Sequence, residues 1–119
     1  MNSSLQRIVL AKVNVKIIAK WLSSGEAFLV DVRETSEFEQ EHIPGAMLVP
    51  LSMLDPKTFP RFQIKKLVLH CATGDRSAAA AKMLVKAGHR PPINMAGGIK
   101  AWREAGLNTE IFDKPTSIT

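Results

Sequence analysis

Short apolar segments alternate along this chain with segments of helical periodicity. The strongest apolar segment, Lys66–His70, reads Lys-Leu-Val-Leu-His and continues through a short loop into an alanine-rich helical segment. Further strands are expected at residues 8–13, 28–32, 46–49 and Ile93–Met95, each a short run rich in aliphatic side chains. Strands that alternate with helices across short loops predict an α/β fold, with a mostly parallel central sheet of about five strands and helices on both faces.

The helical segments carry their own start and stop signals. Val15, Ile18 and Leu22 fall at helical spacing, with Asn14 as the expected N-cap and Gly25 as the stop. A short helix is expected at 34–41, packed through Phe38, and another early in 51–63. From Arg76 a helix should present one apolar face and end before Gly88, and a last helix should follow Gly97-Gly98, point Ile99 and Trp102 inward and end at Gly106. The expected inward face of the Arg76 helix comprises Ala80, Met83, Leu84 and Ala87.

Length and charge limit the organisation and the partners. The 119 residues suit one domain, with a core at about 13–107 and flexible ends at 1–7 and 113–119. The 16 basic and 11 acidic residues give a net charge of +5, but the basic residues form no block and no aromatic residues interleave them. This excludes the usual nucleic-acid patterns and leaves either a solvated basic surface or a small anionic partner.

Cysteine count and hydropathy bear on the compartment. A single cysteine excludes an internal disulfide and a resolving cysteine, so any sulfur chemistry must end on an external acceptor. We find neither a signal-peptide pattern at the N-terminus nor an apolar stretch long enough to cross a bilayer. We therefore expect a cytoplasmic protein with no membrane association through this chain.

The loop after Lys66–His70 carries the strongest functional signal. It reads Cys-Ala-Thr-Gly-Asp-Arg from Cys71 to Arg76, between a strand and a helix. At such a junction, unpaired backbone N–H groups and the helix dipole favour a thiolate over a thiol, and they equally favour the terminal sulfur of a persulfide. Gly74 permits a tight turn, and Arg76 adds a permanent cation. A buried, unreactive structural thiol is the alternative, but the position of Cys71 favours reactivity.

Three ordered motifs give a family resemblance over residues 15–106. They are Asp31-Val32-Arg33-Glu34 with Glu37-Phe38 and residues 41–46, then the loop from Cys71 to Arg76, then residues 97–102 (Gly-Gly-Ile-Lys-Ala-Trp). Together they resemble the single-domain rhodaneses of the thiosulfate sulfurtransferase family. The resemblance implies a three-layer rhodanese-like sandwich and a sulfurtransferase reaction.

The resemblance also assigns roles. Cys71 would accept sulfane sulfur from a donor such as thiosulfate and pass it as a persulfide to cyanide, a thiol or a protein acceptor. The substrate-binding residues would be Ala72, Thr73, Gly74, Asp75 and Arg76. It implies no metal and no cofactor. Because Asp75 adds a carboxylate beside Arg76, we expect weaker attraction for a doubly charged donor.

Four other polar residues are interpreted as structural support. Asp31, Arg33, Glu37 and His42 precede the loop by 29 or more positions, and buried charges need partners whether or not they react. We expect them to form an ion-pair and hydrogen-bond network. His70, at the end of its strand, should point away from the sulfur.

Two rival functions stay open at this stage. A cysteine-dependent phosphatase or arsenate reductase has a related loop, but such loops usually place five residues between cysteine and arginine, whereas four separate Cys71 from Arg76 here. The other rival is a non-catalytic interaction module of the same fold. Such modules commonly lose the cysteine, and this chain keeps it.

Overall fold

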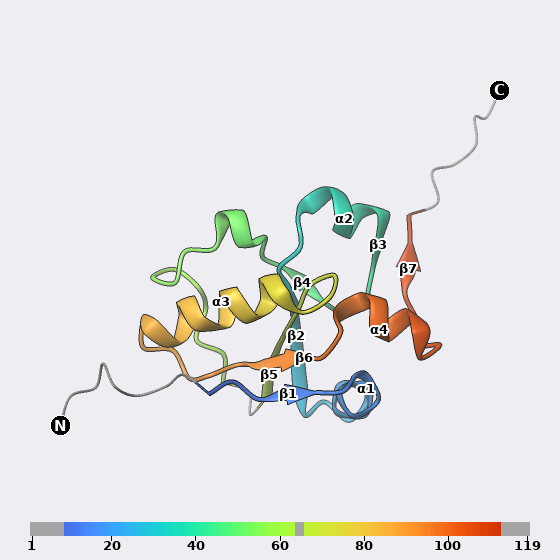
Figure 1. Cartoon of the computed structure of the whole chain (residues 1–119), viewed down its shortest axis with the longest axis horizontal. Helices are drawn as coiled ribbons and strands as arrows, with labels where there is room; N and C mark the ends of the chain where they lie inside the picture. The colour runs from blue at the N-terminus through green and yellow to red at the C-terminus, as the bar shows by residue number, and fades with distance from the viewer. Residues whose placement is uncertain (1–8, 64–65, 113–119) are drawn as a thin grey trace.

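The computed structural model describes residues 9–63 and 66–112, and its centre is a five-stranded sheet (Figure 1). The strand order is β1-β6-β5-β2-β4, and every paired neighbour is parallel. The strands are β1 (Lys12–Val13), β2 (Ala27–Asp31), β4 (Met47–Leu48), β5 (Lys66–His70) and β6 (Ile93–Met95). The α/β fold with a parallel sheet of five strands is therefore confirmed.

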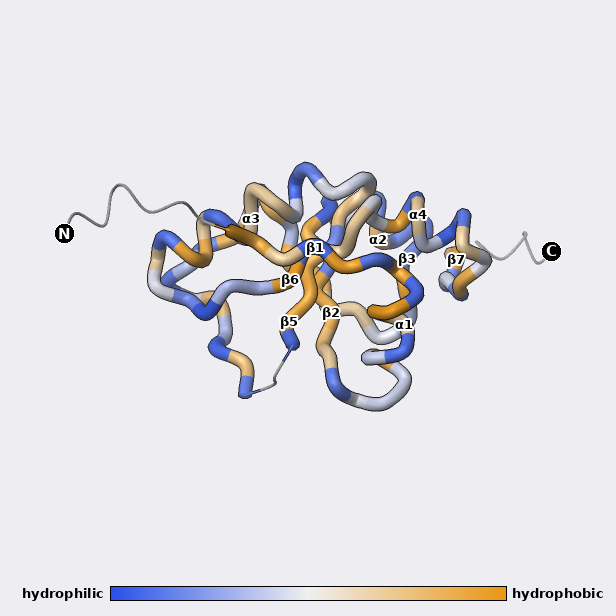
Figure 2. Tube along the Cα trace, turned by 60° about the horizontal axis from the view of Figure 1, so that its bottom comes forward, coloured by the Kyte–Doolittle hydropathy of each residue, from blue (hydrophilic) through white to orange (hydrophobic). Residues whose placement is uncertain are grey.

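Helices cover both faces of this sheet. They are α1 (Val15–Ser23), α2 (Thr35–Gln40), the 3₁₀ helix η2 (Leu51–Met53), α3 (Asp75–Lys86) and α4 (Gly98–Glu104). Successive strand residues point to opposite faces, so Val68 packs in the cluster formed with α1 and α4, while Leu69 packs in the cluster formed with α3. Figure 2 shows the hydrophobic residues concentrated along β2 and β5 at the centre of the molecule.

Helix α1 follows the expected local signals. Asn14 caps it, because the Asn14 Oδ1 accepts a hydrogen bond of 3.0 Å from the Ile17 N–H. The helix ends at Ser23, and Gly25 adopts a positive φ of 79° just beyond it. Helix α3 ends in the same way, with Gly88 at a φ of 90°.

Several boundaries and orientations differ from the prediction. The first strand is confined to Lys12–Val13, with residue 8 outside the described residues, and the strand predicted at 28–32 is Ala27–Asp31. Met83, expected in the core, is 37% exposed, and Ala87 is exposed as well, because the buried stripe of α3 is narrow. That stripe consists of Ser77, Ala80, Ala81 and Leu84.

The segment around α2 forms an edge structure that the sequence did not indicate. Helix α2 has no buried residue, and Phe38 packs on the ring of His42 at a centroid distance of 4.0 Å instead of entering the core. The following strand β3 (Glu41–His42) pairs antiparallel with β7 (Glu110–Ile111). This small second sheet ties the end of the described chain to α2.

The expectations on the chain ends and on membrane spans can be compared with the described residues only. The predicted flexible ends, 1–7 and 113–119, lie outside the described residues. Within residues 9–63 and 66–112, no helix is both long enough and apolar enough to span a membrane.

Candidate active site

Cys71 lies at the carboxyl end of β5, in the loop before α3. Ligand and catalytic sites of parallel α/β sheets gather at this edge. The loop is only four residues long, since α3 begins at Asp75. Gly74 adopts a φ of 115°, which side-chain-bearing residues rarely reach, and so turns the chain sharply into the helix.

The Cys71 sulfur receives hydrogen bonds from the helix start. The Gly74 N–H donates to Sγ at 3.1 Å, and the Ser77 hydroxyl lies 3.4 Å from Sγ. The residue is only 1% exposed, and aliphatic side chains of the α3-side core pack behind it. The sulfur thus has an apolar side and a side formed by polar donors.

These two sides act oppositely on the ionisation of the thiol. Burial by itself raises the pKa of Cys71, because a thiolate is poorly solvated in an apolar surrounding. Hydrogen bonds from the Ser77 hydroxyl and from the backbone N–H groups of Ser77, Gly74 and Thr73 oppose this effect. The donors outweigh burial, so the net pKa of the Cys71 thiol is lowered.

Ser77 and Asn94 are site residues that our sequence interpretation missed. The Ser77 Oγ lies 2.6 Å from Asn94 Oδ1, and Asn94 Nδ2 donates to the Gly74 carbonyl at 3.1 Å. Both residues are buried. The signals were a serine three positions after the turn glycine and a single amide within the otherwise apolar segment Ile93–Met95.

Helix α4 supports the loop from behind. The Ile99 N–H donates to the Cys71 carbonyl at 2.9 Å, and the Lys100 N–H donates to the Ala72 carbonyl at 3.1 Å. Such close approach requires glycine at position 98, because a Cβ there would lie 2.4 Å from the Ala72 carbonyl oxygen. The start of one helix therefore fixes the carbonyls of the loop whose N–H groups face the sulfur.

Arg76, at the end of the loop, forms an ion pair with Glu37 of α2. Its Nη1 and Nη2 donate to the two carboxylate oxygens of Glu37 at 2.7 and 2.9 Å. This fork-to-fork hydrogen bonding lowers the pKa of Glu37 to about 2, against a smaller opposing effect of burial. Among the other loop residues, Thr73 and Asp75 are exposed and Ala72 is half-buried.

Comparison with known protein families identifies the family of this chain. The model of the rhodanese-like domain matches residues 14–105, which is most of the chain. The chain belongs to the rhodanese-like domain family. The match includes the cysteine loop, helices α3 and α4, and the paired Glu37.

Individual relatives of this rhodanese-like domain differ in what is known of them. The uncharacterized protein slr1261 of Synechocystis is 41% identical over 90% of this chain and 63% of its own length. The human thiosulfate:glutathione sulfurtransferase is 30% identical over 77% of this chain and 92% of its own. A Rhodopseudomonas palustris protein of unknown function, called a possible tyrosine phosphatase, is 31% identical with a TM-score of 0.73, covering 85% of both chains.

The chain is also shorter than several of the proteins that it matches. It spans 63% of the Synechocystis relative and 22% of a probable adenylyltransferase/sulfurtransferase of Mycobacterium tuberculosis. Activities of those whole proteins therefore do not transfer directly to this rhodanese-like domain.

Three of the four predicted support residues lie close to the loop. Asp31 and Arg33 are buried and joined by three side-chain hydrogen bonds of 2.8 to 3.1 Å, and Arg33 Nη2 also donates to the Glu41 carbonyl at 2.7 Å. Glu37 is connected to the loop by its ion pair with Arg76. His42 lies apart, in the small sheet, where its ring nitrogens face the Phe38 carbonyl and Glu110.

His70 is buried beside Asp31. Its Nδ1 lies 3.1 Å from the Cys71 carbonyl oxygen, and its Nε2 lies 3.4 Å from Asp31 Oδ2 without hydrogen-bond alignment. Burial lowers the pKa of this imidazole, and the nearby Asp31 carboxylate opposes that effect only in part. The ring is therefore neutral near pH 7 and contacts the backbone of Cys71.

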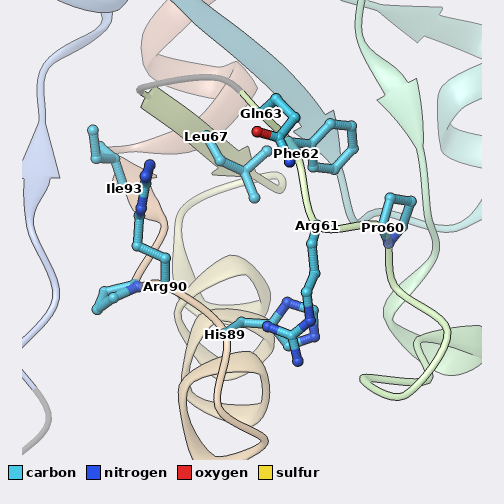
Figure 3. Close-up of a pocket in the computed structure, with 9 residues that line it drawn as sticks. Pro60, Arg61, Phe62, Gln63, Leu67, His89, Arg90 and Ile93 are labelled. Carbon is cyan, nitrogen blue, oxygen red and sulfur yellow. The ribbon is translucent and has the colours of Figure 1, made fainter.

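Two cavities in the described part of the chain lie at opposite ends of the sheet. A cavity of about 390 Å³ adjoins the cysteine loop, with Ala72, Ile99, Glu37 and Arg103 in its wall. A second cavity, of about 230 Å³, lies at the amino ends of β5 and β6, where Leu67 and Ile93 line it (Figure 3). Of these two, the first offers a donor molecule the shorter approach to the cysteine loop.

Proposed function

We propose that this rhodanese-like domain is a sulfurtransferase that carries sulfane sulfur on Cys71. The Cys71 thiolate attacks the outer sulfur of a donor such as thiosulfate, a new S–S bond forms, and the old S–S bond breaks. Sulfite leaves with the electron pair of that bond, and Cys71 keeps a persulfide anion. A cyanide ion or a thiolate then takes the terminal sulfur and regenerates the thiolate.

The observation that carries this proposal is the hydrogen bond from the Gly74 N–H to Cys71 Sγ at 3.1 Å. Together with the Ser77 hydroxyl, it lowers the pKa of the thiol although the sulfur is buried. The same donors suit the terminal sulfur of a persulfide, which also carries a negative charge. Ala72, Thr73, Gly74, Asp75 and Arg76 form the proposed substrate-binding loop.

Two relatives of this domain support the same class of reaction, although a third is called a possible tyrosine phosphatase. One is called a thiosulfate:glutathione sulfurtransferase and another a putative sulfur carrier protein. We propose a small anionic sulfur donor, with cyanide, a small thiol or a protein thiol as acceptor. The proposed reaction needs neither a metal nor an organic cofactor. The cytoplasmic location expected from the sequence stays a prediction.

A phosphatase or arsenate reductase is the main rival, and the size of the loop argues against it. Four residues separate Cys71 from Arg76, and the guanidinium is already paired with Glu37. A phosphate ester or an arsenate ion needs a ring of donors wide enough for a tetrahedral oxyanion. A non-catalytic interaction module is disfavoured by the lowered pKa of Cys71, which docking alone would not require.

Intact-protein mass spectrometry tests the proposal. After incubation with thiosulfate or methanethiosulfonate, the protein should gain the mass of one sulfur atom, and a thiol or cyanide should remove it. Cys71→Ser should gain nothing while keeping its fold. An unmodified wild-type protein that hydrolyses an aryl phosphate would favour the phosphatase, and loss of both activities would favour an interaction module.

A further inference from the structure

Arg76 follows Asp75 at the end of the cysteine loop, and a carboxylate already holds its guanidinium. Both of its terminal nitrogens donate to Glu37, at 2.7 and 2.9 Å. Both side chains are 35% exposed, and Glu37 lines the cavity that adjoins the cysteine loop. An incoming anion therefore meets an ion pair at this position.

The other arginines around the neighbouring cavity are paired as well. Among the described residues of this region, each guanidinium lies within 3.0 Å of a carboxylate oxygen. The three pairs are Arg33 with Asp31, Arg76 with Glu37, and Arg103 with Glu41. Asp75 adds one more carboxylate at the start of α3. The net charge of +5 is thus not concentrated at the mouth of the active site.

Glu37 is held in place from its own side. Its Oε1 accepts a hydrogen bond of 2.9 Å from the Glu34 N–H, and its own N–H donates to the Glu34 carbonyl at 3.0 Å. Glu34 is fixed in turn by the Ser52 hydroxyl, which donates to Glu34 Oε1 at 2.8 Å. With its pKa lowered to about 2, Glu37 stays ionised at any physiological pH. A donor anion must either share Arg76 with this carboxylate or displace it.

We propose that Glu37 is a specificity-determining residue that disfavours doubly charged sulfur donors. This inference rests on the proposed sulfurtransferase function. The preferred donors are then sulfane-sulfur compounds with at most one negative charge at the reacting end, such as thiosulfonates and organic persulfides. Repulsion by the fixed carboxylate is twice as large for the thiosulfate dianion as for a monoanion at the same distance.

Two donors that differ by one charge give a direct test. Thiosulfate and methanethiosulfonate both offer a sulfur bonded to a sulfonyl sulfur, and they leave sulfite and methanesulfinate, respectively. The second-order rate constant for loading Cys71 is measured with each donor by mass spectrometry. In Glu37→Gln the ratio of the thiosulfate rate to the methanethiosulfonate rate should rise roughly fivefold, and the gain should diminish at high salt.

The ratio also guards against a folding defect, because the fraction of active protein cancels in it. The amide introduced by Glu37→Gln keeps an oxygen that accepts the Glu34 N–H, so helix α2 retains its start. The matched control is Glu39→Gln, an exposed residue of the same helix, which removes the same charge and should leave the ratio unchanged.

The outcomes separate this inference from the function on which it rests. Sulfur loading in both proteins with an unchanged ratio would overturn the role of Glu37 alone. A fall of the ratio in Glu37→Gln would likewise overturn it, because Glu37 would then be orienting Arg76 for the dianion. Absence of loading from both donors in the wild-type protein would overturn the proposed function together with the inference.

Discussion

Two strand-to-helix junctions stand side by side at the same edge of the sheet and do different work. Both begin their helix after a glycine of positive φ, Gly74 at 115° before α3 and Gly97 at 77° before α4. At the first junction the N–H groups face the sulfur of Cys71. At the second they donate to the carbonyls of Cys71 and Ala72.

The difference shows how a reactive sulfur is kept in a small domain. The first junction has a short loop that must hold its N–H groups inward around one atom. The second junction fixes this loop through two backbone hydrogen bonds to its carbonyl groups. The Asn94 side chain on β6 adds a third hydrogen bond, to the Gly74 carbonyl. The first junction thus provides the donors to the sulfur, and the second junction mainly keeps the loop of the first one rigid.

Crowding at the supporting junction gives the largest predicted effect. In Gly98→Ala the new Cβ would lie 2.4 Å from the Ala72 carbonyl oxygen, so the loop must move. We expect a loss of about 3 kcal/mol in the free energy of unfolding, and loss of sulfur loading. Urea denaturation measures the first and mass spectrometry the second.

Gly106→Ala is the matched control for that substitution. Gly106 also has a positive φ, 76°, but nothing lies within 4 Å of a Cβ placed there. It should lose about 1 kcal/mol and retain loading. Equal effects of the two substitutions would mean that Gly98 is needed for its φ alone and not for the close approach to the loop.

Gly74→Ala at the reactive junction should be milder than Gly98→Ala. A Cβ at Gly74 meets only the Gly97 nitrogen, at 3.8 Å, so the cost is that of the φ of 115°. We expect about 1–2 kcal/mol in the free energy of unfolding. Relaxation of the strained φ should also turn the N–H away from Sγ and raise the pKa of the Cys71 thiol, which alkylation rates at several pH values would detect.

Ser77 links the two junctions, and Ser77→Ala should act mainly on the sulfur. The single proton of the Ser77 hydroxyl has two alternative acceptors, Sγ at 3.4 Å and the buried Asn94 Oδ1 at 2.6 Å, and the change removes this donor from both. The pKa of Cys71 should rise, and loading at neutral pH should fall by roughly fivefold. Ser36→Ala, an exposed change in α2, is the control. An unaltered thiol pKa would remove Ser77 from the cradle.

The smallest predicted effect is the contribution of the Arg76–Glu37 ion pair, which joins the reactive junction to α2, to the free energy of unfolding. Since the pKa of Glu37 is lowered to about 2, its ion pair stabilises the fold above the ordinary carboxyl value of 4.5 and is lost as the pH falls toward 2. Because the pair is 35% exposed, we expect only about 0.5–1 kcal/mol. Urea denaturation of wild type and Glu37→Gln at pH 5.0 and pH 2.5 should show this difference, whereas an equal acid loss in both would contradict it.

The sequence predicted the layers of the fold better than its edges. Lys66–His70 and Ile93–Met95 were predicted to the residue, because a buried parallel strand must be apolar and short. Met83 was placed wrongly because helical periodicity alone does not say how wide the buried stripe is. The small β3–β7 sheet escaped prediction because its strands are two residues long and pair across most of the chain.

The candidate site could be proposed from the sequence where its residues are close together in the chain. Cys71, Gly74 and Arg76 lie within six consecutive residues. Their proposed roles follow from the position of this loop between a predicted strand and a predicted helix. The pairing of Arg76 with Glu37 joins residues 39 positions apart, and Ser77 on α3 hydrogen-bonds to Asn94 on β6. Contacts of this kind depend on strand order, which no single segment of the sequence encodes.

The proposed mechanism depends on backbone and hydroxyl donors that stabilise a negative charge on the Cys71 sulfur. A pH titration of the thiolate by its ultraviolet absorbance measures this stabilisation, and it is unambiguous because the chain has one cysteine. We expect a pKa below that of an ordinary cysteine, about 8.5, and a return to that value in the unfolded protein. A folded-state pKa at or above the unfolded value would contradict the mechanism, because burial would then outweigh the donors.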